Sequence, residues 1–380
     1  MRIGIEVRWI ALSKTGFGNY TLNLIRELSR IDEKNQYYLY FNKEFQDDLT
    51  PQKKNFHKII IKMYSGIYKH LCIPLDIVFN KRNLDLFHFA YNSPSIWFPC
   101  KFVLTIHDAS FKYIPEMLSK KDLFSISTKL YISARKAEKV ITDSENSKRD
   151  IVKFFKVLEE KIAVIYLGVD ESFQIISNRE ILNDIRRKYN LPEKYLLYVG
   201  SYLPHKNLDT LIKAFCDLKR NTNTRHSLVL CGKKGRNFLN ISKLIRELQL
   251  DDCVFCIGYV PADELPILYN MSDLFIFPSL YEGFGLPILE AMACGVPVIA
   301  SNSSCLPEIA GEAALLFNPR DKNELAKAIY NLLTDAKAYN YFVEKGLKRA
   351  KQFTWRKMAE GILKIYEDIC KMGEQAVLKT

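Results

Sequence analysis

The sequence predicts an α/β protein made of two doubly wound parallel-sheet domains in series. The first observation is length, because 380 residues suit two domains of ordinary size. The second is a regular alternation of strand-like and helix-like runs, which is typical of parallel sheets with helices on both faces. The third is a polar connector at 168–190, after which the alternation restarts near Tyr195.

The first half is expected to form a domain over residues 1–170. A helix follows the first strand and carries Tyr20, Leu24 and Leu28 at spacings that place them on one buried face. The strand-like runs of this half are Ile3–Trp9, Tyr37–Phe41, Leu86–Phe89, Phe102–Ile106, Val140–Asp143 and Ile162–Leu167.

The second half is expected to form a domain over residues 171–354, followed by a last helix in 355–380. Its strand-like runs are Tyr195–Val199, Leu228–Cys231, Val254–Ile257, Leu274–Phe277, Val296–Ala300 and Ala314–Phe317. Ligands of such sheets bind outside the carboxyl ends of the strands. We therefore expect functional residues in the loops that follow strands.

Composition restricts the class of protein. The chain is 48% hydrophobic and 26% charged, and its apolar runs are far shorter than the roughly 20 residues of a spanning helix. Its N-terminus shows no apolar signal region, so we expect a cytoplasmic protein. The net charge of +12 favours anionic partners: nucleic acid, phosphorylated small molecules or an anionic membrane. Cys253 and Cys256 lie in a strand-like run, which indicates buried thiols rather than a metal site.

Two loops of the first half contain candidate ligands. Gly16 and Gly18 open a helix, where backbone amides and the helix dipole suit a phosphate, although a plain tight turn has the same sequence. His107 follows a strand and precedes Asp108, so its imidazole is placed to bond a substrate hydroxyl or a developing charge.

Two loops of the second half give stronger signals. Lys206 lies at the start of a helix, where an ammonium is unfavourable unless an anion binds nearby. Gly283 and Gly285 allow close approach of the backbone to a ligand. Glu282 and Glu290 supply two carboxylates, which accept bidentate bonds from the vicinal hydroxyls of a ribose or a hexose.

These segments together resemble the retaining glycosyltransferases of family 4, or glycosyl transferases group 1, which have the GT-B fold. The matching segments are Thr15–Thr21, Thr105–Asp108, Val199–Asn207, Phe353–Trp355 and Glu282–Glu290, the last being the E-x7-E element of the family. The resemblance implies two Rossmann-like domains facing across a cleft, an acceptor-side N-terminal domain and a C-terminal domain that binds a nucleotide sugar. The last helix, from about Trp355, is expected to cross back to the first domain.

The resemblance also implies roles for single residues. Glu290 is expected to bind ribose, Glu282 the hydroxyls of the transferred sugar, Lys206 the diphosphate and His107 the donor sugar near the reacting carbon. The remaining donor-binding residues are expected to be Gly16, Phe284, Gly285 and Leu286 at the phosphates, Tyr259 and Val260 at the nucleobase, and Ser201.

Ser201 departs from the family pattern, because many members have an arginine at this position. Lys233, Lys234 or Arg236, in the loop after the next strand, is a candidate replacement for that diphosphate cation, and a solvated basic turn is the alternative. No Asp-x-Asp pair occurs in the chain, so we expect neither a metal nor another cofactor. The N-termini of helices and Lys206 would instead stabilise the charge on the leaving group, a nucleoside diphosphate.

The resemblance therefore implies a retaining hexosyltransferase. The sequences of Ile106–Phe111 and Pro204–Asn207 resemble those of bacterial mannosyltransferases of surface-polysaccharide and lipopolysaccharide synthesis. This resemblance favours GDP-mannose as the donor and a glycan or lipid-linked acceptor. Basic and apolar residues mix at 57–82, so peripheral contact with the inner face of an anionic membrane is expected, an acceptor-side loop being the alternative. Two other functions remain open: a nucleotide-sugar epimerase and a non-catalytic nucleic-acid binder, though paired glutamates argue against nucleic acid.

Overall fold

The computed structural model describes residues 1–8, 10, 16–44, 50–62, 71–91, 97–115 and 118–377, without the side chains of Phe17 and residues 372–377. It divides into two units, one made of Met1–Gly168 with Trp355–Thr380 and the other of Val169–Thr354. The boundaries expected from the sequence lay after residues 170 and 354. Each unit contains one parallel sheet, which is the α/β organisation that the strand–helix alternation predicts.

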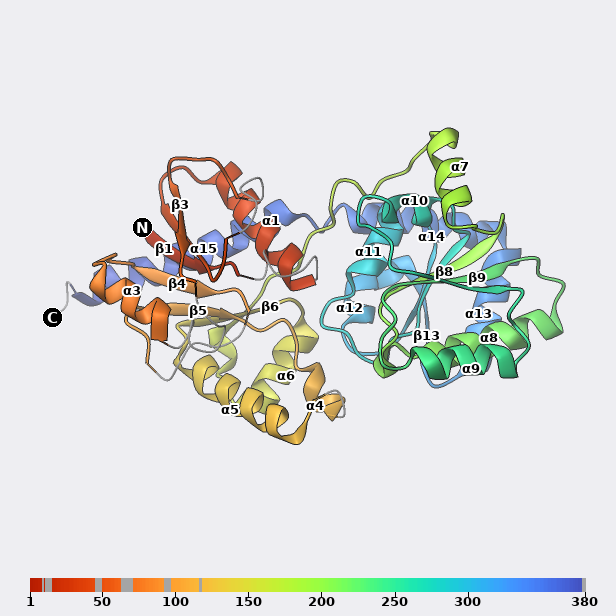
Figure 1. Cartoon of the computed structure of the whole chain (residues 1–380), viewed down its shortest axis with the longest axis horizontal. Coiled ribbons are helices and arrows are strands. Elements are labelled where there is room, and N and C mark those ends of the chain that lie inside the picture. Colours follow the sequence, from red (N-terminus) through yellow and green to blue (C-terminus); the bar gives the residue numbers. More distant parts are fainter. Residues whose placement is uncertain are drawn as a thin grey trace. The chain divides into compact units, whose positions relative to one another are not determined.

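Among the described residues of the first unit, seven strands form one sheet in the order β3-β2-β1-β4-β5-β6-β7 (Figure 1). The strands are β1 (Arg2–Glu6), β2 (Gln36–Phe41), β3 (Phe56–Ile60), β4 (Leu86–Phe89), β5 (Phe102–Thr105), β6 (Lys139–Thr142) and β7 (Ile162–Val164). The first strand ends at Glu6, and Trp9 lies outside the described residues. Strand β3 was not predicted, because it is a half-buried edge strand that contains two basic residues and lacks a clear buried face.

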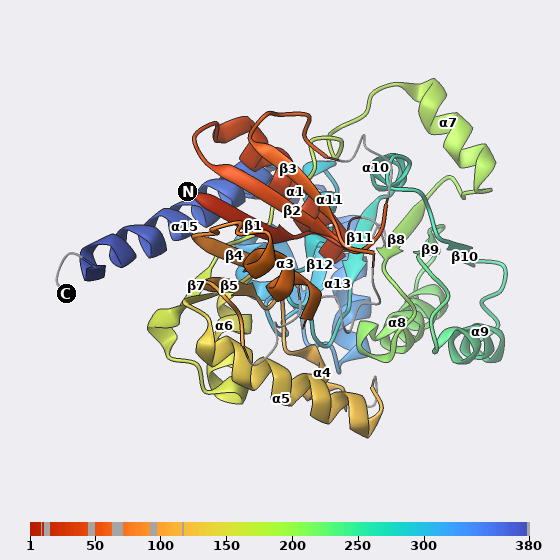
Figure 2. The same cartoon turned by 60° about the vertical axis from the view of Figure 1, so that its left-hand side comes forward.

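Helices cover both faces of this sheet. They are α1 (Gly16–Ile31), α3 (Ile73–Phe79), α4 (Ser110–Tyr113), α5 (Lys120–Lys136), α6 (Glu145–Phe155) and α15 (Trp355–Val377), with the 3₁₀ turn η4 (Glu159–Lys161). Helices α1 and α15 lie on one side and α5 and α6 on the other, as Figure 2 also shows. The predicted face of Tyr20, Leu24 and Leu28 is buried. Burying each such side chain contributes about 1.5–3 kcal/mol.

The sheet of the second unit has six parallel strands in the order β10-β9-β8-β11-β12-β13. The strands are β8 (Tyr195–Val199), β9 (Ser227–Cys231), β10 (Val254–Gly258), β11 (Leu274–Phe277), β12 (Val298–Ser301) and β13 (Ala314–Phe317). All six coincide with predicted runs to within two residues at either end. The sequence signal is clean here because these strands are largely buried and read as continuous apolar runs.

The helices of the second unit form two layers. They are α7 (Arg179–Lys188), α8 (Leu208–Asn221), α9 (Phe238–Glu247), α10 (Leu265–Asn270), α11 (Leu286–Ala293), α12 (Leu306–Ala310), α13 (Lys322–Thr334) and α14 (Ala336–Ala350), with the 3₁₀ turns η5 (Pro204–Lys206) and η6 (Gly311–Ala313). Helices α8, α9 and α13 cover one face of the sheet and α10, α11 and α14 the other (Figure 1). Helix α7 is the single helix expected in the polar connector.

Each sheet has one point at which the strand order reverses. In the first unit it lies between β1 and β4, and in the second between β8 and β11. Loops diverge on either side of such a point and leave a crevice outside the carboxyl ends of the strands, where ligands bind. Within the described part of the chain, no helix has the length and apolar character needed to cross a bilayer.

Candidate active site

The reversal point of the second unit brings Lys206 and Glu282 together. Lys206 ends the turn η5 after β8, and Glu282 lies in the loop after β11. The Lys206 Nζ lies 2.5 Å from the Glu282 Oε1, and only 15% and 14% of the two side chains is exposed. From the sequence, Lys206 was expected to bind the diphosphate and Glu282 the hydroxyls of the transferred sugar, with no contact foreseen between the two. The carboxylate already offsets the unfavourable ammonium at the start of α8, so that argument for a bound anion at Lys206 does not hold.

Asn207 fixes the loops around this ion pair. It has a left-handed backbone with a φ of 58°, and its side-chain amide donates to the carbonyls of Pro278, at 3.0 Å, and Pro319, at 2.7 Å. The Leu280 amide donates to the His205 carbonyl at 2.7 Å. The loops that follow β8, β11 and β13 are thereby tied to one another. The sequence analysis missed this role of Asn207, although an asparagine between a turn and a helix indicates a left-handed position.

The glycine loop before α11 is built for close approach. Gly285 precedes the helix with a φ of 96°, and a Cβ atom there would lie 2.7 Å from the Leu306 Cδ2. The Glu282 amide donates to the Ser304 Oγ at 2.9 Å. Phe284 and Gly285 directly precede α11 and Leu286 is its first residue, so all three lie at the predicted helix start, where the helix dipole is positive.

Glu290 lies about one turn into α11 and is paired with a tyrosine. Its Oε2 accepts a hydrogen bond of 3.0 Å from the hydroxyl of Tyr269, which comes from α10 and is fully buried. Burial raises the pKa of Glu290 to about 7, opposed by the Tyr269 hydrogen bond and assisted by the charge of Asp170. The carboxyl group therefore titrates near neutral pH. The sequence analysis did not single out Tyr269, because a tyrosine in an apolar helix has the pattern of a core residue.

A glycine lies at or directly after the end of three neighbouring strands. Gly200, Gly232 and Gly258 close β8, β9 and β10, and a Cβ on Gly232 would lie 1.9 Å from the Gly200 carbonyl oxygen. Such close backbone packing admits only glycine at this position. Ser201 follows Gly200 directly, and Tyr259 with Val260 follows Gly258. These predicted donor ligands therefore all lie at the carboxyl ends of the strands.

Two of the candidate replacements for the missing arginine lie against aromatic rings. The Lys233 Nζ is 5.5 Å from the centre of the Tyr259 ring, and the Lys234 Nζ is 4.5 Å from that of Phe238. Arg236, the third candidate, is exposed. Lys233 is thus associated with the residue predicted to lie beside the nucleobase.

The first unit places His107 against a buried carboxylate. His107 follows β5 and Asp143 follows β6, and the His107 Nδ1 is 2.7 Å from the Asp143 Oδ2. Both side chains are buried. Burial of the ring opposes protonation, but the charge and hydrogen bond of Asp143, with smaller effects of Asp108 and the Ala90 carbonyl, raise the pKa of His107. The partner of His107 is therefore Asp143, directly after the next strand of the sheet, and this pairing was not predicted from the sequence.

A second buried ion pair ends β1 at the reversal point of this sheet. The Arg8 Nε lies 2.6 Å from the Glu6 Oε1, and both side chains are almost fully buried. Gly16 begins α1, as predicted, whereas Thr15 of the same motif lies outside the described residues. The pair of Glu6 and Arg8 was not predicted from the sequence. Two opposite charges two residues apart at the end of an apolar strand would have indicated it.

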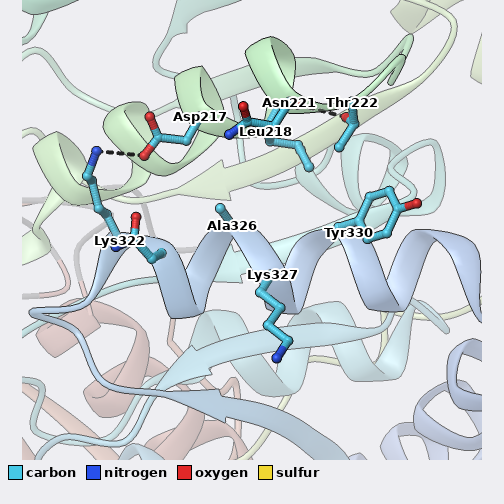
Figure 3. A pocket seen from close by; sticks show the side chains of 9 residues that line it. Asp217, Leu218, Asn221, Thr222, Lys322, Ala326, Lys327 and Tyr330 are labelled. Carbon is cyan, nitrogen blue, oxygen red and sulfur yellow. Dashed lines mark hydrogen bonds and ion pairs between the residues drawn. The ribbon is translucent and has the colours of Figure 1, made fainter.

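The remaining features lie away from these residues. A groove of about 500 Å³ runs between α8 and α13 (Figure 3), and none of the candidate residues lines it. Cys253 and Cys256 are half-buried free thiols, which corrects the expectation that they are buried. Among the described residues, no group of three or more His, Cys, Asp or Glu side chains is arranged to hold a metal ion.

Comparison with known families identifies the class of protein. Residues 15–173 match the family described as Glycosyltransferase Family 4, and residues 183–349 match the family described as Glycosyl transferases group 1. The chain belongs to these glycosyltransferases, and its two Rossmann-like units have the GT-B fold. The resemblance found in the sequence is thereby confirmed.

Individual relatives and solved structures give a more detailed comparison. The chain is 30% identical over 381 residues to the O-antigen chain mannosyltransferase B of Escherichia coli, covering 97% of this chain and 100% of the relative. It is 32% identical over 261 residues to the O-antigen chain mannosyltransferase RfbU of Salmonella typhimurium, covering 68% and 69%. Among solved structures it is similar to Anabaena HepE in complex with UDP and glucose, with a TM-score of 0.75 and 18% identity over 97% and 100% of the two chains.

Proposed function

We propose that this glycosyltransferase moves mannose from GDP-mannose to a glycan or lipid-linked acceptor, with retention of configuration, in cell-surface polysaccharide or lipopolysaccharide synthesis. The observation that carries the proposal is the grouping of Lys206, Glu282 and Glu290 around the strand-order reversal of the second unit. The choice of mannose rests on the relatives from Escherichia coli and Salmonella, both named as mannosyltransferases.

The donor ligands divide by chemistry. Glu290 accepts hydrogen bonds from the ribose hydroxyls, and Glu282 accepts them from the transferred sugar. The amides of Phe284, Gly285 and Leu286 bind the diphosphate because a helix start attracts anions. Lys206 binds it as the family resemblance implies, while its ammonium also contacts Glu282. The other predicted ligands keep the roles expected from the sequence: Gly16 and Ser201 at the phosphates, Tyr259 and Val260 at the nucleobase.

In this proposal the reaction occurs on one face of the sugar. The bond between the anomeric carbon and the diphosphate oxygen breaks while the acceptor oxygen forms its bond on the same face. The acceptor hydroxyl gives its proton to the departing diphosphate. Lys206 and the dipole of α11 stabilise the charge that develops on the leaving oxygen, without a metal ion. His107 contacts the donor sugar close to the reacting carbon.

Two measurements test this function. Calorimetry with GDP, UDP and GDP-mannose reports the nucleotide, and we expect tight binding of the guanine compounds. Transfer from GDP-mannose labelled at the anomeric carbon to a lipid-linked glycan fraction reports the reaction, and the carbon–hydrogen coupling of the product reports its configuration. An inverted product would refute retention. Release of an isomeric nucleotide sugar without any acceptor would instead favour an epimerase.

We also propose that the first unit contacts an anionic bilayer. Helix α3 and the turn before it carry an exposed apolar stripe, with exposed fractions of 53% for Leu71, 38% for Leu75, 47% for Val78 and 75% for Phe79. The exposed Lys81 follows the helix, so that apolar insertion and charge attraction would act together. Residues 63–70 of the predicted basic segment lie outside the described part.

Vesicle flotation tests the membrane proposal. The full-length protein is floated with vesicles that contain anionic lipid at low salt. Phe79→Asp should abolish flotation, because a charge cannot enter the apolar layer. Leu239→Asp is the matched control, since Leu239 is equally exposed, at 78%, but lies on α9 of the second unit. Equal flotation of the two variants would remove α3 from the contact.

A further inference from the structure

We infer that Asp143 is a positioning residue for His107: it holds the imidazole in one orientation and in the tautomer whose hydrogen is on Nδ1. The inference rests on the proposed function of His107 beside the donor sugar. Asp143 itself is not proposed to touch the substrate. Its contribution would be to present the opposite edge of the ring in a constant geometry.

The pairing of adjacent strands places the two side chains together. Strands β5 and β6 run parallel, with Thr105 opposite Ile141, and the Ile106 amide donates to the Ile141 carbonyl at 2.8 Å. His107 and Asp143 each lie two residues beyond this pair, so both occupy the same face at the same level. The register of the two strands therefore brings the residues that follow them together, and the His107 Nδ1 and the Asp143 Oδ2 are 2.7 Å apart.

The chemistry of the partner decides which ring nitrogen carries hydrogen. An ionised carboxylate only accepts hydrogen bonds, so the imidazole nitrogen facing it has to be the donor. The His107 Nδ1 consequently keeps its hydrogen in both the neutral and the protonated ring. An asparagine at the same position could donate as well as accept, and it would allow the other tautomer.

A second set of contacts restricts the orientation of the ring. The rings of Tyr20 and His107 pack in a T-shaped arrangement, with centres 4.8 Å apart and an interplanar angle of 83°. The Tyr20 hydroxyl is 3.1 Å from the Thr105 Oγ1, which is 2.7 Å from the His88 Nε2. The His88 Nδ1 is 2.5 Å from the hydroxyl of Tyr366 on α15. The His107 ring thus packs against Tyr20, whose hydroxyl belongs to a buried hydrogen-bond network. This packing restricts the orientation of the His107 ring.

Nitrogen-15 NMR of histidine-labelled full-length protein tests the tautomer without any activity measurement. In the wild type we expect the His107 Nδ1 to carry hydrogen at every pH at which Asp143 is ionised. In Asp143→Asn we expect a mixture of tautomers or the opposite one. A neutral wild-type ring with hydrogen on Nε2 alone would overturn the inference, and this measurement requires no variant to fold.

Kinetics tests whether the arrangement matters for transfer. Asp143→Asn should lower turnover tenfold or more and leave the affinity for free nucleoside diphosphate unchanged, because that ligand lacks the sugar. In a His107→Ala background, Asp143→Asn should have no further effect on turnover. Asp150→Asn is the matched control, because Asp150 is also a buried carboxylate, bonded at 2.5 Å by the Tyr113 hydroxyl, and it should keep wild-type turnover.

The outcomes separate this inference from the proposed function. Wild-type turnover in Asp143→Asn, or an equal loss with and without His107, would overturn the positioning role while leaving glycosyl transfer intact. If the wild type transfers no sugar from any nucleotide donor, the proposed function fails, and the NMR measurement still decides whether Asp143 sets the tautomer.

Discussion

The pKa of Glu290 leads to a quantitative prediction about donor binding. The proposed ribose contact is strongest when the carboxyl group is ionised, because charge-assisted hydrogen bonds are worth roughly 1.5–3 kcal/mol against about 1 kcal/mol for neutral ones. Burial raises the pKa of this group to about 7. The ionised form is therefore about 10% of the total at pH 6 and about 90% at pH 8. Because the ionised form should bind about tenfold more tightly than the neutral form, we expect the affinity for nucleoside diphosphate to rise about fivefold between these values.

Glu290→Gln isolates this contribution. The amide keeps the size of the side chain but cannot ionise, so the variant should bind about ninefold more weakly than the wild type at pH 8 and only about twofold more weakly at pH 6. The terminal phosphate of the ligand also titrates near pH 6. Its share of the pH dependence remains in the variant, and the difference between the two proteins belongs to Glu290.

Isothermal calorimetry at pH 6, 7 and 8 measures these affinities. Glu264→Gln is the matched control: Glu264 also accepts a tyrosine hydroxyl, that of Tyr189 at 2.6 Å, but Lys188 and Tyr189 lower its pKa, so it stays ionised over this range. The control should follow the wild-type pH dependence. If wild type and Glu290→Gln change in parallel from pH 6 to 8, Glu290 does not titrate in contact with the ligand, and the reasoning is refuted.

The remaining predictions concern charge, metal and backbone. Lys206→Ala should weaken nucleoside diphosphate binding and lower turnover tenfold or more, whereas Lys213→Ala, on the exposed side of α8, should change neither in calorimetry and transfer assays. EDTA should leave transfer nearly intact, and an activity restored only by manganese would contradict the proposed electrostatic mechanism. Gly285→Ala should cost about 1–3 kcal/mol of folding free energy, seen as a lower Tm, because of its positive φ and the contact with Leu306; an unchanged Tm would contradict this.

The order of elements was predictable because it depends on local patterns. Buried parallel strands such as β8 and β11 are short apolar runs, and the observed bounds of both agree with the predicted ones. The edge strand β3 escaped prediction, since a half-buried edge tolerates polar residues and shows no distinct pattern. The end of β1 at Glu6 was predicted too late for a different reason, because the buried Val7 continues the apolar pattern beyond the strand.

The candidate site was predictable as a set of residue types, and its internal contacts were not. Sequence spacing indicated Lys206, Glu282 and Glu290 separately, because each follows a strand or opens a helix. Nothing in the spacing showed that Lys206 and Glu282 are 2.5 Å apart, or that Tyr269 bonds Glu290. These contacts join residues between 21 and 76 positions apart in the chain, and only strand order and helix packing bring them together.

By itself the sequence determined the two α/β units, the loops that contain the candidate residues and the family, because periodicity and short motifs are local properties of the chain. The tertiary structure alone decided which charged groups neutralise one another: Lys206 with Glu282, and His107 with Asp143. It also decided that Glu290 titrates near neutral pH. The physical reason is that ion pairing and desolvation depend on distance and burial in three dimensions, which strand register and helix packing fix only in the folded chain.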